Sequence, residues 1–350
     1  MKLKDILKLI KRQPRFGKGA LPDPYDYRDY KYEDVLGAEE TVDWNKGYDI
    51  EKEIGAKIPF KNQGLSGSCV GQAISYYSGV LNTVETKKYD EVSAKSIYSL
   101  IELGLPQGGA YIRDGMKLVV DLGALFEKIL SSYKNGLAPD EPYMKDKSWK
   151  TESMLKLAKI LQAKEYRTIT NSLNMNTFAI AVKNNYGIVG GVNGSNNNTW
   201  NSFEPRTGPS SWGHALYFGK FGTDKLGKYI ATPNSWGTRG NPDELHSDGW
   251  QKLREEWFTS EYMFSPWTLI DKPNFAGLSP ETSAVLAKAE MKLIVEGTGS
   301  GRVGIVVNGK LLEISNDRKA AAALYLLANN GFGFTVNTTV FEELPKNHNF

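Results

Sequence analysis

The chain has 350 residues, of which 40% are apolar and 24% are charged, a composition that excludes disorder over most of the length. The net charge of +3, from 43 basic and 40 acidic side chains, gives no reason to expect nucleic acid as a partner. No apolar run reaches the roughly 20 residues that a membrane-spanning helix needs, so a membrane partner is not expected either.

The N-terminal residues 1–12 (MKLKDILKLIKR) carry apolar side chains at helical spacing and lysines mostly elsewhere. This pattern predicts an amphipathic helix that docks on its own domain or on a neighbouring subunit. A membrane-surface anchor is the alternative, and the apolar run is too short for a secretory signal peptide. Residues 13–40 are rich in Pro, Gly, Tyr and charge, which predicts an extended lead-in, so residues 1–40 form one N-terminal unit.

A globular domain is predicted over residues 41–271. Its first half has apolar residues at helical spacing, which predicts helices at 69–83, 93–103, 113–121 and 151–164. After about residue 176, short β-rich segments alternate with turns, which predicts strands at 186–193, 213–220, 227–232, 249–253 and 265–270. A long polar loop at 193–211 separates two of these strands.

The C-terminal part is expected to be separate. Residues 272–286 have the composition of a linker, and residues 287–350 predict a small α+β domain. Its expected elements are strands at 290–297, 303–308 and 310–314, a helix at 317–329 and a strand at 333–342. This domain contains no recognisable nucleophile, metal cluster or phosphate loop. It is therefore expected to be a targeting or interaction module, and this domain and the N-terminal helix are the expected contacts with a protein partner in an assembly.

Cys69 is the single cysteine, so no intrachain disulfide can form, which favours a reducing compartment. A glycine-rich turn (residues 61–68, KNQGLSGS) leads directly into the helix predicted from residue 69. A helix N-terminus stabilises a thiolate, the reactive form of cysteine. Gln63 lies six residues earlier, where its side-chain amide could reach an oxyanion.

The chain has three histidines. His214 begins a predicted strand and Asn234 follows on the next one, so adjacent strands are expected to bring the two side chains together. His246 and His348 lie in polar stretches that predict loops. One cysteine and three scattered histidines give no ligand spacing for a metal, and no cofactor is expected.

Five ordered stretches resemble the papain-like (cathepsin-type) cysteine peptidases. Residues 42–44 resemble the mature N-terminus of that family, 63–69 its nucleophile motif and 108–109 its groove glycines. Residues 213–215 resemble its histidine motif, and 234–238 (NSWGT) its asparagine motif. The resemblance spans about residues 41–271.

The resemblance implies an α+β fold with two subdomains: a helical left subdomain that carries Cys69, and a β-barrel-like right subdomain that carries His214 and Asn234. A groove between them would bind an extended polypeptide substrate. Cys69 would attack the peptide carbonyl, His214 would act as acid and base, Asn234 would orient the His214 ring, and Gln63 would stabilise the oxyanion. The implied substrate-binding residues are Gly67, Ser68, Gly108, Gly109 and Gly213, with Trp236 shielding the Asn–His hydrogen bond.

The sequence departs from the family at several positions. Ser66 replaces a disulfide-forming cysteine, Val70 replaces an aromatic residue and Gly213 replaces an acidic or amide residue. The 193–211 loop and the long stretch 237–250 lie near the implied groove. The lead-in is too short for the family's helical propeptide, so the Tyr-rich stretch 25–32 is expected to lie along the surface or across the groove.

Three functions remain open at this point. The leading one is a cysteine endopeptidase. The alternatives are a catalytically silent papain-fold component of a larger assembly, such as a virus particle, and acyl transfer on a non-protein amide. A cytoplasmic or assembly-associated location, such as a virion, is expected.

Overall fold

The computed structural model describes residues 19–35, 41–170, 174–194, 212–237 and 250–270, together with four strands between 293 and 336. The chain divides into two compact units, residues 1–271 and 272–350, and each is described by itself. The predicted N-terminal helix, the linker, the helix at 317–329 and most of the 193–211 loop lie outside the described residues.

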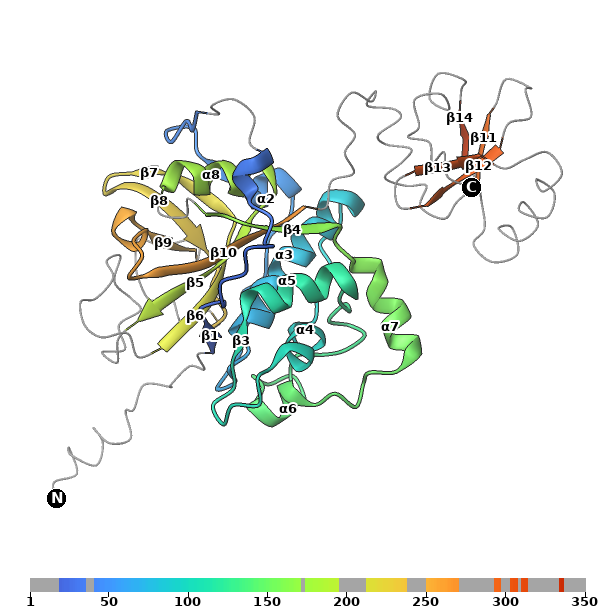
Figure 1. Ribbon diagram of the computed structural model, residues 1–350, viewed down its shortest axis with the longest axis horizontal. Coiled ribbons are helices and arrows are strands. Elements are labelled where there is room, and N and C mark those ends of the chain that lie inside the picture. Colours follow the sequence, from blue (N-terminus) through green and yellow to red (C-terminus); the bar gives the residue numbers. More distant parts are fainter. Residues whose placement is uncertain are drawn as a thin grey trace. The chain divides into compact units, whose positions relative to one another are not determined.

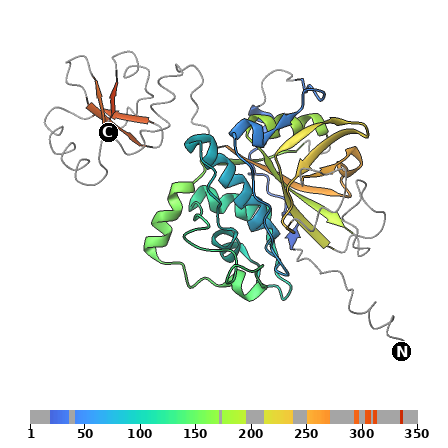
Figure 2. The same cartoon turned by 180° about the vertical axis from the view of Figure 1, so that it is seen from behind.

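Helices make up one half of the larger unit, on one side of it in both views (Figures 1 and 2). At its centre is α3 (Cys69–Thr86), of which 15 of 18 residues are buried. Gly71 allows α4 to pack closely, because a Cβ there would lie 2.7 Å from the Cβ of Tyr98. The other described helices of this unit are α2 (Ile50–Ile54), α4 (Ala94–Ile101), α5 (Ile112–Asp121), α6 (Glu141–Lys145), α7 (Glu152–Ala158) and α8 (Met175–Asn184), of which α8 lies on the side of the strands (Figure 1).

Two antiparallel sheets of four strands make up the other half. The first has the order β4-β10-β5-β6, with β4 (Glu165–Thr168), β5 (Ile188–Gly194), β6 (Trp212–Phe218) and β10 (Met263–Ile270). The second has the order β2-β7-β8-β9, with β2 (Tyr48–Asp49), β7 (Lys220–Asp224), β8 (Gly227–Thr232) and β9 (Gln251–Leu253). The chain passes from the first sheet to the second at Gly219, which links β6 to β7.

The helices expected at 69–83, 93–103 and 113–121 are confirmed as α3, α4 and α5. The helix expected at 151–164 is wrong in its last part: α7 ends at Ala158, a 3₁₀ turn covers 159–161, and β4 starts at Glu165. The cause is a competing hydrogen bond. The Ala124 N–H takes the Ala158 carbonyl at 3.1 Å, which a continuing helix would use for Gln162.

Helix α8 (Met175–Asn184) was not expected, because this stretch lies at the start of the β-rich region. Its apolar residues do have helical spacing, and Phe178 is fully buried against Phe218 and Phe258 with ring centroids at 5.3 and 5.1 Å. The Asn174 side chain caps the first turn by accepting from the Asn176 N–H. Strand β7 was also not expected, whereas the five expected strands coincide with β5, β6, β8, β9 and β10.

The second unit contains one four-stranded sheet of order β13-β12-β11-β14. Its strands are β11 (Leu293–Glu296), β12 (Val303–Val307), β13 (Lys310–Glu313) and β14 (Phe334–Val336), which coincide with the four expected strands. The β11–β12 and β12–β13 pairs are antiparallel, and β11–β14 is parallel. Two parallel strands need a crossover connection between them. The helix predicted at 317–329 falls in the part of the sequence between β13 and β14.

Candidate active site

Cys69 is the first residue of α3 and follows the turn that ends in Ser68. The Ser68 carbonyl accepts the Gln72 N–H at 3.0 Å, so the helix starts at the expected residue. This places the thiol at the positive end of an 18-residue helix, where a thiolate is favoured. The Cys69 side chain is fully buried.

The surroundings of Cys69 have two opposing effects on the pKa of its thiol. Burial raises the pKa of Cys69 to about 11, while backbone N–H groups of Ala215, Gly19, Val70 and Ala20 act in the opposite direction. Ala215 follows His214 on β6, so this contact brings the histidine strand against the sulfur. Gly19 and Ala20 come from the N-terminal lead-in, which also lies against the thiol.

His214 and Asn234 form the second part of the site. His214 is fully buried on β6, and its Nε2 lies 2.9 Å from Oδ1 of Asn234. The expectation that adjacent strands join them is wrong: Asn234 comes two residues after β8, and β6 and β8 belong to different sheets. The residues meet where the two sheets pack together, because Asn234 turns back with a positive φ of 54°.

The hydrogen bonds around Asn234 assign the tautomer of a neutral His214 ring. The Ser235 N–H can only donate, and it contacts Asn234 Oδ1 at 2.6 Å, so this atom is the amide oxygen and not the nitrogen. His214 Nε2 faces the same oxygen and therefore donates to it. In a neutral ring Nδ1 is then the acceptor, which is the state that a general base requires.

Gln63 is fully buried beside the turn that precedes Cys69. Its Nε2 donates to the Ser66 carbonyl at 2.9 Å, and its Oε1 accepts from the Ser235 hydroxyl at 2.5 Å. Because a carbonyl can only accept, the amide nitrogen must lie on the side of the Cys69 turn. Gln63 thus joins the turn before Cys69 to the segment that carries Asn234.

Trp236 stacks on His214 with ring centroids 4.4 Å apart and an interplanar angle of 22°. It is buried, and its predicted role of keeping water from the His–Asn hydrogen bond stays a prediction. Two further residues hold Asn234 and were missed from the sequence. Gln251 accepts from Asn234 Nδ2 at 2.8 Å, and the Tyr76 hydroxyl donates to the Asn234 carbonyl at 2.9 Å.

The expected substrate-binding glycines surround a segment of the chain itself, residues 19–24, which we call the covering segment. Its strand β1 (Ala20–Leu21) pairs in parallel with β3 (Ala110–Tyr111), and the Ala110 N–H donates to the Gly19 carbonyl at 2.8 Å. On the opposite side, the Gly19 N–H donates to the Gly213 carbonyl at 3.2 Å. Figure 1 shows β1 at the boundary between the helical and the β-rich half.

This fit depends on the absence of side chains. A Cβ at Gly19 would lie 2.2 Å from the Gly67 carbonyl oxygen and 3.0 Å from the Gly109 Cα. A Cβ at Gly213 would lie 2.2 Å from the Ala20 carbonyl oxygen. Gly67, Gly109 and Gly213 therefore border one extended backbone, and Gly108 lies beside Gly109 with a positive φ of 78°. Ser68 is buried behind them, within hydrogen-bond distance of Ser66.

Asp23 attaches the covering segment to both halves of the unit. Its Oδ2 accepts from Trp267 Nε1 at 2.6 Å, and its Oδ1 accepts from the Arg113 N–H at 3.2 Å. Its own N–H donates to Ser265 at 2.8 Å. Of the tyrosines that follow, Tyr25, Tyr27 and Tyr30 are exposed at 93%, 82% and 68%, whereas Tyr32 is buried at 3%. Residues 25–30 thus lie along the surface, Tyr32 packs into the core, and the residues against Cys69 come from an earlier part of the lead-in.

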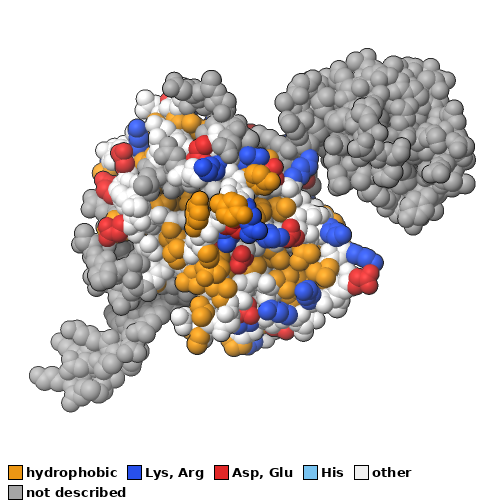
Figure 3. Space-filling model, in the orientation of Figure 1, with side chains coloured by type: hydrophobic (Ala, Val, Ile, Leu, Met, Phe, Trp, Pro, Cys, Tyr) orange, Lys and Arg blue, Asp and Glu red, His pale blue; other side chains and the backbone are white. Residues whose placement is uncertain are grey.

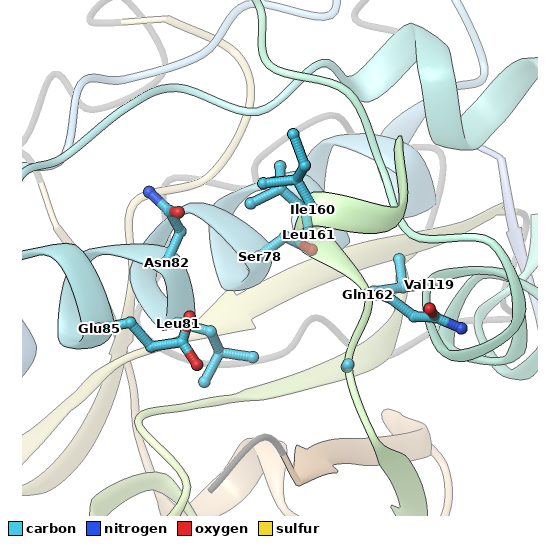
Figure 4. A pocket seen from close by; sticks show the side chains of 9 residues that line it. Ser78, Leu81, Asn82, Glu85, Val119, Ile160, Leu161 and Gln162 are labelled. Carbon is cyan, nitrogen blue, oxygen red and sulfur yellow. The ribbon is translucent and has the colours of Figure 1, made fainter. Parts of the chain in front are cut away.

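A small pocket opens beside the C-terminal half of α3, at the other end of the helix from Cys69. Its polar lining residues are Ser78, Asn82, Glu85 and Gln162 (Figure 4). No histidine is visible on the described face in Figure 3, in keeping with the burial of His214. Within the described ranges, no three His, Cys, Asp or Glu side chains gather as metal ligands. None of the described helices is long and apolar enough to cross a bilayer.

Solved structures with a similar fold include two cysteine proteases. Xylellain from Xylella fastidiosa matches with a TM-score of 0.57 and 20% identity, over 74% of this chain and 98% of xylellain. The proform of the ragweed pollen allergen Amb a 11 matches with a TM-score of 0.51 and 16% identity, over 77% of this chain and 73% of that one. No family model matches the sequence, and a comparison with curated proteins found no match. The two structural matches show that the chain has the papain-like fold with its two subdomains.

Proposed function

We propose that this protein is a cysteine endopeptidase that uses Cys69, His214 and Asn234 as its catalytic triad. One observation carries the proposal. Cys69 sits at the N-terminus of α3 against the backbone of Ala215, and the neighbouring His214 donates to Asn234 at 2.9 Å. A thiol, an imidazole and an amide in this arrangement support nucleophilic catalysis at a carbonyl. The papain-like fold of the cysteine proteases above agrees with this chemistry.

The reaction would proceed in two steps. His214 Nδ1 takes the proton of Cys69, and the thiolate attacks the peptide carbonyl to form a C–S bond. The C–N bond then breaks as the imidazolium gives its proton to the leaving amine. In the second step water attacks the thioester, its proton passes to His214, and the acid product and the thiol are released. The Cys69 N–H and the Gln63 amide would stabilise the oxyanion in both steps.

The described state would be an inhibited one. The backbone of Gly19 and Ala20 lies against the thiol, and Cys69 has no exposed surface. A peptide cannot reach Cys69 until the covering segment moves. The pKa of about 11 for the thiol belongs to this covered state. Once the segment leaves, water returns to the site and the desolvation that raises the pKa is reduced.

The test is labelling with an epoxide-type cysteine-peptidase inhibitor, followed by intact mass, together with hydrolysis of fluorogenic peptides under reducing conditions. Full-length protein is compared with the variant Asp23→Ala, which is expected to loosen the covering segment. We expect one adduct and peptide hydrolysis, both absent in Cys69→Ala and strongly slowed in His214→Ala. Ser78→Ala, on the same helix but beside the small pocket, should behave like the unaltered chain.

The other functions would give different results. Transfer of an acyl group to an added amine without hydrolysis would indicate an acyl transferase. The absence of an adduct in both the full-length protein and Asp23→Ala would indicate a silent component of an assembly and would overturn the proposal.

A further inference from the structure

One carboxylate outside the triad lies between the two glycine turns that flank the covering segment. Glu141 is the first residue of α6. Its Oε2 accepts the Gly67 N–H at 2.6 Å, and its Oε1 accepts the Tyr98 hydroxyl at 2.6 Å. The Tyr98 oxygen in turn accepts the Gly109 N–H at 2.9 Å. Glu141 is thereby joined to the turn before Cys69 and, through Tyr98, to the turn at Gly109.

Gly108 packs directly against this pair of side chains. A Cβ on Gly108 would lie 2.4 Å from Glu141 Oε1 and 2.5 Å from the Tyr98 hydroxyl oxygen. With a φ of 78°, this residue has a conformation that L side chains rarely adopt. The carboxylate and the hydroxyl thus occupy the space where a side chain would stand, and they fix the position of the Gly108 backbone.

Lys145 lies four residues after Glu141 on α6 and contacts the other end of the turn formed by residues 105–109. Its Nζ donates to the Leu105 carbonyl at 2.8 Å and lies 3.4 Å from Glu141 Oε1. The Gly108 N–H closes the turn on that same carbonyl at 2.9 Å. Helix α6 therefore holds residues 105–109 at both ends. The Glu141 side chain is 15% exposed, so its charge-assisted hydrogen bonds are partly protected from water.

The two turns held by Glu141 are the ones that contact an extended backbone. Gly19 touches Gly67 and Gly109, and the next N–H, that of Ala110, donates to it. A peptide substrate that replaced the covering segment would lie between the same turns. Their relative position decides whether the backbone contacts on both turns can form at once.

We propose that Glu141 is a positioning residue that sets the distance between the Gly67 turn and the Gly109 turn for binding of the substrate backbone. This inference rests on the peptidase function proposed above. Glu141 does not touch the thiol, so its effect is on the binding of an extended peptide and not on the bond-breaking step. The Tyr98 hydroxyl transmits this effect to Gly109.

The first arm of the test is kinetic. Glu141→Gln keeps the shape, but its amide can accept only one of the two hydrogen bonds. The full-length chain is assayed, with Asp23→Ala added to every variant if the unaltered chain is too slow. For a peptide with three residues before the scissile bond, we expect the KM of Glu141→Gln to be about tenfold higher than that of the unaltered chain, which corresponds to the loss of one charge-assisted hydrogen bond. The kcat of the two proteins should agree within about twofold. A substrate with one such residue should be unaffected.

The second arm is amide hydrogen exchange, which needs no activity. In Glu141→Gln we expect faster exchange at Gly67, Gly109 and Ala110, and in Tyr98→Phe at Gly109 and Ala110 only. The control Glu152→Gln, on the exposed surface of α7, should change neither arm. If no variant hydrolyses peptides, the peptidase function fails and exchange alone decides the positioning role. Unchanged KM and exchange, or a loss of kcat at constant KM, would overturn the inference.

Discussion

Tyr76 lies two helical turns after Cys69 on α3, and its hydroxyl donates to the carbonyl oxygen of Asn234 at 2.9 Å. The same hydroxyl oxygen accepts the Lys61 N–H. The helix that begins at Cys69 therefore also holds the backbone of Asn234, the residue proposed to orient His214. Because Tyr76 is buried, water cannot replace either bond when the hydroxyl is removed.

Tyr76→Phe is expected to lower both stability and activity. The loss of the hydroxyl leaves the Lys61 N–H and the Asn234 carbonyl without this partner, which costs about 1–3 kcal/mol in the free energy of unfolding. The displaced Asn234 should also lower kcat. Tyr77→Phe is the matched control, since its hydroxyl contacts Thr268 and not Asn234. Urea unfolding and peptide hydrolysis are measured on both. Equal kcat in the two variants would contradict a role of Tyr76 in the site.

The covering segment should be loosened by Asp23→Ala. This change removes the acceptors of Trp267 Nε1 and of the Arg113 N–H. At about 1 kcal/mol for each hydrogen bond, we expect alkylation of Cys69 by iodoacetamide to become roughly tenfold faster or more. Arg28→Ala is the control in the same stretch, because Arg28 pairs with the neighbouring Asp26 at the surface. Equal rates in both variants would mean that Asp23 does not hold the segment.

The raised pKa of Cys69 predicts a dependence of stability on pH. The folded thiol has a pKa of about 11 against an ordinary value of 9.0, so the folded state holds its proton more tightly than the unfolded state. Its contribution is complete below pH 9 and is lost as the pH rises towards 11. Urea unfolding at pH 8 and pH 10 should show a larger loss for the unaltered chain than for Cys69→Ala. Identical losses would disprove the linkage.

Gln251 should affect catalysis through Asn234. Gln251→Leu removes the acceptor of Asn234 Nδ2 and frees the amide to rotate away from His214. We expect kcat to fall about tenfold with KM unchanged, and Asn234→Ala to be at least as severe. Gln162→Leu serves as the control, since its amide donates to the Val120 carbonyl away from the site. A rise in KM without a change in kcat would argue against this role.

The sequence singled out Cys69, His214 and Asn234 by a glycine turn before a helix and by strand-like segments, together with the resemblance to the papain-like peptidases, and their catalytic roles stay predictions. It could not predict how His214 and Asn234 meet, because contacts between two sheets leave no local periodicity. Gln251 and Glu141 were missed for a different reason. Both act by hydrogen bonds to partners far away in the chain, and backbone N–H partners such as that of Gly67 have no sequence signature.

The structure of the lead-in was the hardest part of the larger unit to predict from the sequence. Asp23 lies in a polar, proline-rich stretch whose composition predicts only extended chain, although the structure connects it to Trp267 and Arg113. The end of α7 was misjudged in a similar way, because its competing donor, the Ala124 N–H, comes from a loop some thirty residues earlier. Secondary-structure propensity predicted the elements correctly where tertiary packing favours the same structure, as in α3.

The bare backbone at Gly19 has a consequence for specificity. A residue with a side chain at this point of the path would collide with the Gly67 carbonyl oxygen, which lies 2.2 Å from the position of a Cβ. Most peptides therefore cannot follow the route of residues 19–21, even though they would meet the same walls. The path of the covering segment fits the closed site and is not a template for a substrate, so its sequence says nothing about which bonds the proposed peptidase would cut.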